Sequence, residues 1–204
     1  MAELDEMAKG SFQEAGNKGI GHLATELSEI LGREVKIDIP NVKAPPISKI
    51  IEQASEGSKK SVVGIHLDLS GDVSGGTLIL LPRFSAFSFS DLLLKKSIGS
   101  TTAIEERETM KLKEMGVRLC SSYMRAVNDF LGITMNVGNP ELVVNMDGVG
   151  DFINKQIGGM AEEFIEVKGE CIVPTTNSVK EFKLLFEPDA SDVIMAAVMK
   201  KMMG

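Results

Sequence analysis

The sequence predicts an α/β (α+β) fold in which two α-β-α-β-β-α halves share one sheet, with long helices packed on it. Three observations predict it: a gapless internal repeat, a long helical stripe at the start of each half, and a hairpin of alternating apolar residues in each half. Two halves of this order are expected to be related by a pseudo-two-fold axis through the common sheet.

The internal repeat joins residues 14–40 to residues 114–140 at a constant offset of 100. The identical residues that mark its two ends are Glu14 and Glu114, Gly16 and Gly116, Leu31-Gly32 and Leu131-Gly132, and Pro40 and Pro140. Identities are few, but glycine and proline coincide at both ends, and these residues mark where helices and strands stop. This coincidence favours a true duplication of the chain.

Each half opens with a long helix, because its core-facing residues recur at spacings of three and four. The first stripe consists of Asn17, Ile20, Ala24, Leu27 and Leu31, and the second of Val117, Cys120, Met124, Val127 and Leu131. Gly32 and Gly132 follow the two stripes, and glycine commonly ends a helix by adopting a left-handed conformation.

The remaining elements follow in the same order in both halves. The strands are expected at residues 35–39 and 133–137, each followed by a proline and a second helix, at 47–56 and 146–157. Alternating apolar residues predict one hairpin of residues 62–69 and 75–81 and another of residues 165–173 and 181–186. A closing helix is expected at residues 86–96 and 190–203.

Length and charge limit the functional classes. The 204 residues are expected to form one domain, with a first repeat at 10–97 and a second at 103–204. The net charge of −7 argues against nucleic acid as a partner, because phosphate binding needs clustered Lys and Arg. The acidic start has no apolar core, and no run approaches the roughly 18 apolar residues of a membrane span, so we expect no membrane insertion and a cytoplasmic location.

The cysteines and histidines are assigned ordinary roles. Cys120 and Cys171 lie far apart, outside any C-x-x-C spacing, and are expected to be reduced thiols. His22 and His66 have no cluster of acids or thiols nearby in the sequence, so neither a metal site nor a cofactor of the chain's own is expected. His66 also falls on the outward row of its strand, which predicts contact with solvent.

The candidate chemistry lies in the first helix. Glu14 and Asn17 are three residues apart, so their side chains project from nearly the same face. Neither is a nucleophile or a strong base. A carboxamide can accept a hydrogen bond from a water molecule and hold it in line for attack, and phosphoryl transfer depends on positioning more than on acid–base power. This pair would suffice if a partner supplied the metal ion.

The segment Glu14-Ala15-Gly16-Asn17, followed 23 residues later by Pro40, resembles the signature of the CheC family of chemotaxis phosphatases (CheC, CheX and FliY). That signature is Asp or Ser, three residues, Glu, two residues, Asn, and a proline a little over twenty residues further on. The resemblance implies an enzyme that hydrolyses the aspartyl phosphate of a CheY-type response regulator. It also implies that Asn17 orients the attacking water, that Glu14 pairs with a lysine of the regulator, and that Mg²⁺ belongs to the regulator.

The chain departs from the signature in two places. Gly10 stands four residues before Glu14, where the family has Asp or Ser. The second copy reads Glu114-Met115-Gly116-Val117, and a valine cannot hold a water molecule. Glu114 is therefore expected to dock a partner at most, which leaves one active site, in the first repeat. Met110 replaces the Asp or Ser of the second copy and indicates the same.

Other interpretations stay open. Ser11 and Glu14 fit a helix capping box, in which Glu14 folds back on the backbone, and Asn17 would then be an ordinary surface residue. The resemblance also allows a non-catalytic adaptor that binds CheD, the receptor deamidase, through the helix after the second proline, at residues 140–147. A third reading is a structural module like the flagellar switch protein FliM, which shares the fold but lacks the paired Glu and Asn. The intact pair in this chain favours catalysis.

Overall fold

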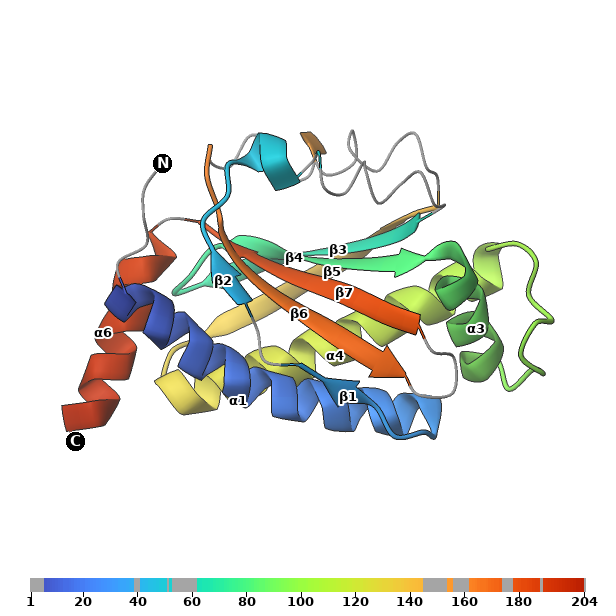
Figure 1. The fold of residues 1–204 in the computed structure, drawn as a ribbon, viewed down its shortest axis with the longest axis horizontal. Coiled ribbons are helices and arrows are strands. Elements are labelled where there is room, and N and C mark those ends of the chain that lie inside the picture. Colours follow the sequence, from blue (N-terminus) through green and yellow to red (C-terminus); the bar gives the residue numbers. More distant parts are fainter. Residues whose placement is uncertain are drawn as a thin grey trace.

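The computed structural model describes residues 6–38, 41–50, 52, 62–144, 154–155, 162–173, 178–187 and 189–203. Figure 1 shows two long helices, α1 (Glu6–Leu31) and α4 (Glu106–Leu131), that lie side by side against one face of a sheet. Two shorter helices, α3 (Arg83–Leu93) and α6 (Ala190–Met203), lie at opposite ends of this pair. Among the described residues, no helix combines the length and the apolar run that crossing a bilayer requires.

The described residues form one sheet of seven strands, all paired antiparallel. They are β1 (Lys36–Ile37), β2 (Asn41–Lys43), β3 (Val62–Gly71), β4 (Gly75–Pro82), β5 (Met135–Val143), β6 (Ile165–Val173) and β7 (Ser178–Phe186). The order is β1-β6-β7-β4-β3-β5, with β2 also paired to β6. Exchanging the two halves of the chain reverses this order, so the pseudo-two-fold axis runs between β4 and β7, as the repeat predicts.

The two halves exchange their first strands. β1 and β2 of the first half pair with β6 of the second, and β5 of the second half pairs with β3 of the first. The duplicated units are therefore interlocked, because each half completes the edge of the other's hairpin. This exchange also fixes where α1 and α4 lie, since each helix leads directly into a strand on the far half of the sheet.

Most predicted elements are confirmed. Both hairpins form at the predicted residues, and α3 and α6 correspond to the two closing helices. Gly32 and Gly132 end α1 and α4 with φ of 62° and 69°, the left-handed conformation expected of a helix-ending glycine.

The predicted strand at 133–137 was too short. β5 continues through Pro140 to Val143, with Pro140 opposite Leu67. β5 is an edge strand with a register shift between Leu67 and Leu69, and an edge or a bulge is where a strand tolerates a residue without an N–H group. Pro40 lies outside the described residues, as does most of each predicted second helix; residues 47–50 and 154–155 are helical.

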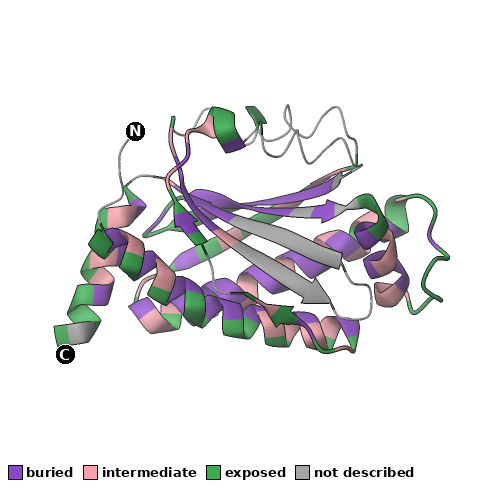
Figure 2. Ribbon diagram, in the orientation of Figure 1, coloured by how far each residue is buried: buried purple, intermediate pink, exposed green. Residues whose placement is uncertain are grey.

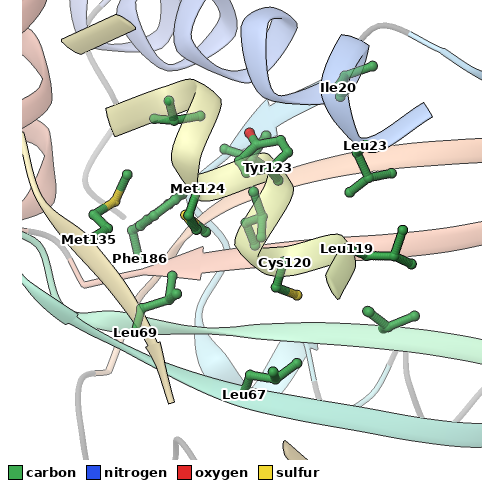
Figure 3. Close-up of a cluster of buried hydrophobic side chains, with 14 of the residues drawn as sticks. Ile20, Leu23, Leu67, Leu69, Leu119, Cys120, Tyr123, Met124, Met135 and Phe186 are labelled. Atoms are coloured by element: carbon green, nitrogen blue, oxygen red, sulfur yellow. The ribbon is translucent and has the colours of Figure 1, made fainter. Parts of the chain in front are cut away.

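The hydrophobic core lies between the sheet and the pair of long helices, where Figure 2 shows the buried residues concentrated. Figure 3 shows Ile20 and Leu23 of α1 and several α4 side chains above Leu67 and Leu69 of β3. The α4 residues labelled there are Leu119, Cys120, Tyr123 and Met124. Part of the second face of the sheet is covered as well: Ile50, in the short helical turn on the side opposite α1 and α4, is fully buried.

The prediction that His66 contacts solvent is wrong. Its side chain is only 3% exposed, in the row of β3 that faces away from the long helices. Burial lowers the pKa of His66, with Asp68 and Glu141 acting in the opposite direction. Sequence alternation identified the row correctly but could not show that this row is buried at His66, although Asp68 and Ser70 in the same row are exposed.

The connection between the two halves is anchored by Asp91 of α3. Its buried carboxylate accepts hydrogen bonds from the backbone N–H groups of Gly99 (2.7 Å), Ser100 (3.1 Å) and Thr101 (2.9 Å), and from the Thr101 hydroxyl (2.6 Å). Burial by itself would raise the pKa of Asp91, but these hydrogen bonds outweigh it and lower the pKa below its ordinary value. Glu108, buried in the first turn of α4, accepts a hydrogen bond from Lys96 Nζ at 3.0 Å, which lowers the pKa of Glu108.

These two depressed pKa values predict acid sensitivity. Since both groups bind a proton more weakly when folded, their contribution to stability is complete above about pH 5 and is lost as the pH falls through their folded pKa values. We expect Asp91→Asn to lower the free energy of unfolding at neutral pH by on the order of 2 kcal/mol. The variant should also show a smaller fall of this free energy at acidic pH, the acid limb of the stability curve. Urea unfolding between pH 7 and pH 2 measures both effects, and an acid limb as steep in the variant as in the wild type would contradict the assignment.

Candidate functional site

Helix α1 presents Glu14 and Asn17 on its solvent face. The helix begins at Glu6, so both residues lie well inside it, and both side chains are exposed. Ser11 is buried, and its hydroxyl donates a hydrogen bond to the carbonyl oxygen of Met7 at 2.9 Å. This is the bond of a serine in a helix interior, so the capping-box interpretation of Ser11 and Glu14 is wrong.

The predicted stripe placed Asn17 at the head of the apolar face, and this prediction is also wrong. The buried face of α1 consists of Ala8, Ser11, Phe12, Ala15, Gly16, Gly19, Ile20, Leu23, Leu27 and Leu31. Gly16 and Gly19 occupy buried positions, and a pattern based on apolar side chains does not detect glycine. The true buried face therefore leaves Asn17 beside Glu14 on the opposite, exposed face.

The side chains of Glu14 and Asn17 make no hydrogen bond or ion pair with another described residue. Gly10 and Gly21 lie four residues before and four residues after the pair, on the same exposed face. A Cβ atom added at either glycine would meet nothing within 4 Å. The carboxylate and the carboxamide are thus accessible to an approaching molecule, with no bulky side chain at the flanking positions of their row.

The equivalent place on α4 differs in each of these respects. Glu114 is exposed, but its Oε2 accepts a hydrogen bond from Lys111 Nζ at 2.6 Å. Val117 is half-buried and packs against the core. Met110, at the position of Gly10, is 62% exposed and would stand in the way of a close partner. The second copy therefore presents a neutralised carboxylate and no amide.

The basic residue that follows each glutamate by four positions is turned towards the other long helix. Lys18 Nζ lies 5.5 Å from the centroid of the Phe130 ring of α4. Arg118 donates hydrogen bonds from Nε (2.9 Å) and Nη2 (2.5 Å) to Oε1 of Glu26 on α1. Sequence reasoning missed both contacts, because spacing along one helix predicts a pair between residues i and i+4 instead.

The remaining chemistry-bearing side chains among the described residues supply no second site. Cys120 is buried against Thr77, and burial raises the pKa of its thiol to about 11, so the reactive thiolate is suppressed. The Cys171 side chain lies outside the described residues. Within the described ranges, no three His, Cys, Asp or Glu side chains gather as metal ligands would. The exposed pair on α1 can bind a cation through Glu14 and orient a water molecule through Asn17.

The fold and this exposed pair define a class of protein: a duplicated two-layer domain with a carboxylate and a carboxamide on one long helix. No protein family model matches the chain. The CheY-P phosphatase CheC of Bacillus subtilis is 25% identical over 143 residues, which cover 67% of this chain and 66% of CheC. The flagellar motor switch phosphatase FliY of the same species is 32% identical over 92 residues, 45% of this chain. The matched segment spans 23% of FliY, so the chain corresponds to only part of each relative.

Solved structures show the same fold. Thermotoga maritima FliY superposes with a TM-score of 0.76 and 21% identity, covering 98% of this chain and 100% of that one. CheX in a CheX–CheY–BeF3–Mg complex from Borrelia burgdorferi superposes with a TM-score of 0.59 and 14% identity. The match covers 84% of this chain and 96% of that one. The FliM middle domain of Helicobacter pylori superposes with a TM-score of 0.65 and 14% identity, and the match covers 95% of this chain and 99% of that one. The chain is thus similar in sequence to CheC and FliY and similar in fold to FliY and CheX, which confirms the resemblance drawn from its motif.

Proposed function

We propose that this chain hydrolyses the aspartyl phosphate of a CheY-type response regulator in chemotaxis, with a single active site at Glu14 and Asn17 of α1. The observation that carries the proposal is the exposure of both side chains on one helix face, without partners among the described residues. The names of the curated relatives, CheY-P phosphatase and motor switch phosphatase, support the reaction class.

The proposed mechanism divides the work between two proteins. The regulator carries the phosphorylated aspartate, the Mg²⁺ that neutralises charge on the phosphoryl group, and an active-site lysine. Glu14 pairs with that lysine and seats α1 against the regulator's active site. Asn17 then accepts a hydrogen bond from a water molecule through its carboxamide oxygen and holds the water in line with the phosphorus. Rigid placement of the water lowers the barrier because phosphoryl transfer is dominated by positioning and electrostatics.

The test is phosphate release from a phosphorylated CheY-type regulator in the presence of Mg²⁺, with the chain at substoichiometric concentration. We expect many regulators to be dephosphorylated per molecule of the chain, faster than the regulator loses phosphate alone. Binding of the phosphorylated regulator without any acceleration would overturn the phosphatase proposal.

Binding without acceleration would favour a non-catalytic module, for which the FliM middle domain provides the structural precedent. CheD remains a predicted partner without a defined contact surface. The predicted contact region at 140–147 was expected to be helical, but Pro140–Val143 belong to strand β5, and residues 145–147 lie outside the described ranges. Co-purification with CheD in the absence of phosphatase activity would establish the adaptor role.

The two glutamates offer a matched pair of variants. Glu14→Gln should raise KM for the phosphorylated regulator about tenfold, because a charge-assisted contact to the regulator's lysine is worth about 1.4 kcal/mol or more. Glu114→Gln should leave kcat/KM within about twofold of the wild type, because Lys111 already neutralises Glu114 at an exposed site. Steady-state phosphate release compares them, and equal losses in the two variants would refute the assignment of one active site.

A further inference from the structure

Glu14 and Lys18 are spaced so that they would normally pair. A glutamate four residues before a lysine is the favourable order for an i,i+4 ion pair on a helix. Such a pair would neutralise the carboxylate that the proposed function needs. Both residues are exposed, so no packing prevents the contact. Their ion pair is nevertheless absent among the described interactions, which calls for a physical cause.

Phe130 provides that cause. Its ring lies at the end of α4 and takes the Lys18 ammonium at 5.5 Å from its centroid, within the range of a cation–π contact. The ring packs against the core, and Lys201 of α6 holds the same turn: its Nζ donates to the Phe130 carbonyl oxygen at 2.7 Å and lies 4.5 Å from the ring centroid. The free energy of an exposed cation–π contact is about twice that of an exposed i,i+4 ion pair. The Lys18 ammonium therefore lies against the Phe130 ring instead of pairing with the Glu14 carboxylate.

The second copy shows that removing the cation at i+4 is not sufficient by itself. Arg118, the equivalent of Lys18, is likewise drawn away from Glu114, to Glu26 of α1. Glu114 is nevertheless paired, because Lys111 occupies the position three residues before it. In the first copy that position is Ser11, which is buried and bonded to the backbone. The first copy alone thus has neither a cation before its glutamate nor an available one after it.

We propose that Phe130 is a positioning residue for the first site: its ring holds Lys18 away from Glu14, so that the carboxylate stays available to a cation of the response regulator. This inference rests on the proposed function of Glu14 and adds the device that keeps the side chain unpaired. It also assigns a role to the contact between α1, α4 and α6 at the end of the molecule where these helices meet (Figure 1).

The experiment uses three variants of the full chain: Phe130→Leu, Lys18→Gln and the double variant. Leucine keeps the apolar packing and removes the ring. We expect Phe130→Leu to weaken binding of a beryllofluoride-activated CheY-type regulator about twofold, the factor that corresponds to an exposed i,i+4 ion pair. Lys18→Gln alone should bind as the wild type does, and the double variant should return to the wild-type Kd. Calorimetric titration of the activated regulator in the presence of Mg²⁺ gives the Kd of the wild type and of the three variants.

A second measurement separates this inference from the proposed function. The ε-methylene protons of Lys18 should show an upfield ring-current shift in the NMR spectrum of the wild type, and Phe130→Leu should abolish it. Wild-type affinity in Phe130→Leu, or a failure of Lys18→Gln to restore affinity in that background, would overturn the inference even if the phosphatase proposal holds. A ring-current shift in a protein that does not bind the activated regulator would instead overturn the proposed function, and the role of Phe130 with it.

Discussion

Replacing Asn17 with alanine should lower the turnover of phosphorylated regulator by on the order of a hundredfold, which is about 2.7 kcal/mol of barrier. The reason is that the carboxamide acts on the attacking water and not on the folded protein. The Asn17 side chain is exposed and has no hydrogen-bond partner among the described residues, so truncating it breaks no hydrogen bond of the described fold. Alanine is also the better helix former, by roughly half a kcal/mol, so the variant should be at least as stable as the wild type.

The kinetic pattern is as informative as the size of the loss. If Asn17 positions water only in the transition state, kcat and kcat/KM should fall together while KM stays nearly constant. Val117→Ala is the matched control, because residue 117 occupies the equivalent position on α4. We expect that variant to keep wild-type turnover, with a small loss of stability from the half-buried side chain. Full activity in Asn17→Ala would remove the carboxamide from the mechanism.

The sequence predicted the local elements well, for a physical reason. In hairpins and long helices, buried apolar residues recur in the sequence with periods of 2 and 3.6 residues. Gly32 and Gly132 mark the helix ends in both copies. The exchange of β1, β2 and β5 between halves could not be predicted in this way, because strand pairing across the molecule depends on which edges are vacant. The same applies to β5, whose continuation through Pro140 depends on its place at the edge.

The candidate site was predictable only in part. The helical spacing and the resemblance to the CheC signature singled out Glu14 and Asn17, and the second copy, which replaces the amide with Val117, indicated one active site instead of two. Burial of Ser11 and the exposure of Asn17 depend on which face of α1 meets α4, and two inward glycines concealed that face from a hydrophobicity pattern. The Lys18–Phe130 contact joins residues far apart in the sequence, so helix spacing predicts the wrong partner for Lys18.

Gly19→Ala should be the most destabilising of the single substitutions considered, because the crossing of α1 and α4 leaves no room for a methyl group. A Cβ atom at residue 19 would lie 2.4–2.6 Å from three ring atoms of Tyr123. The ring is rigid and only 2% exposed, so it cannot swing into solvent to make space. Overpacking of this kind costs about 2–3 kcal/mol, which corresponds to a fall in Tm of roughly 5–10 °C for a chain of this size.

Gly21→Ala provides the control two residues further along the same helix. Its added Cβ meets nothing within 4 Å, so this substitution should raise stability by about 0.5–1 kcal/mol through helix propensity alone. A thermal or urea unfolding series on the two variants therefore separates the packing effect from the backbone effect, which is the same in both. In a Tyr123→Leu background the penalty of Gly19→Ala should shrink, since the two residues are in contact and their effects are not additive. Equal stability of the two glycine variants would mean that the helices do not cross at Gly19, and would remove the basis for placing Glu14 and Asn17 on the outer face of α1.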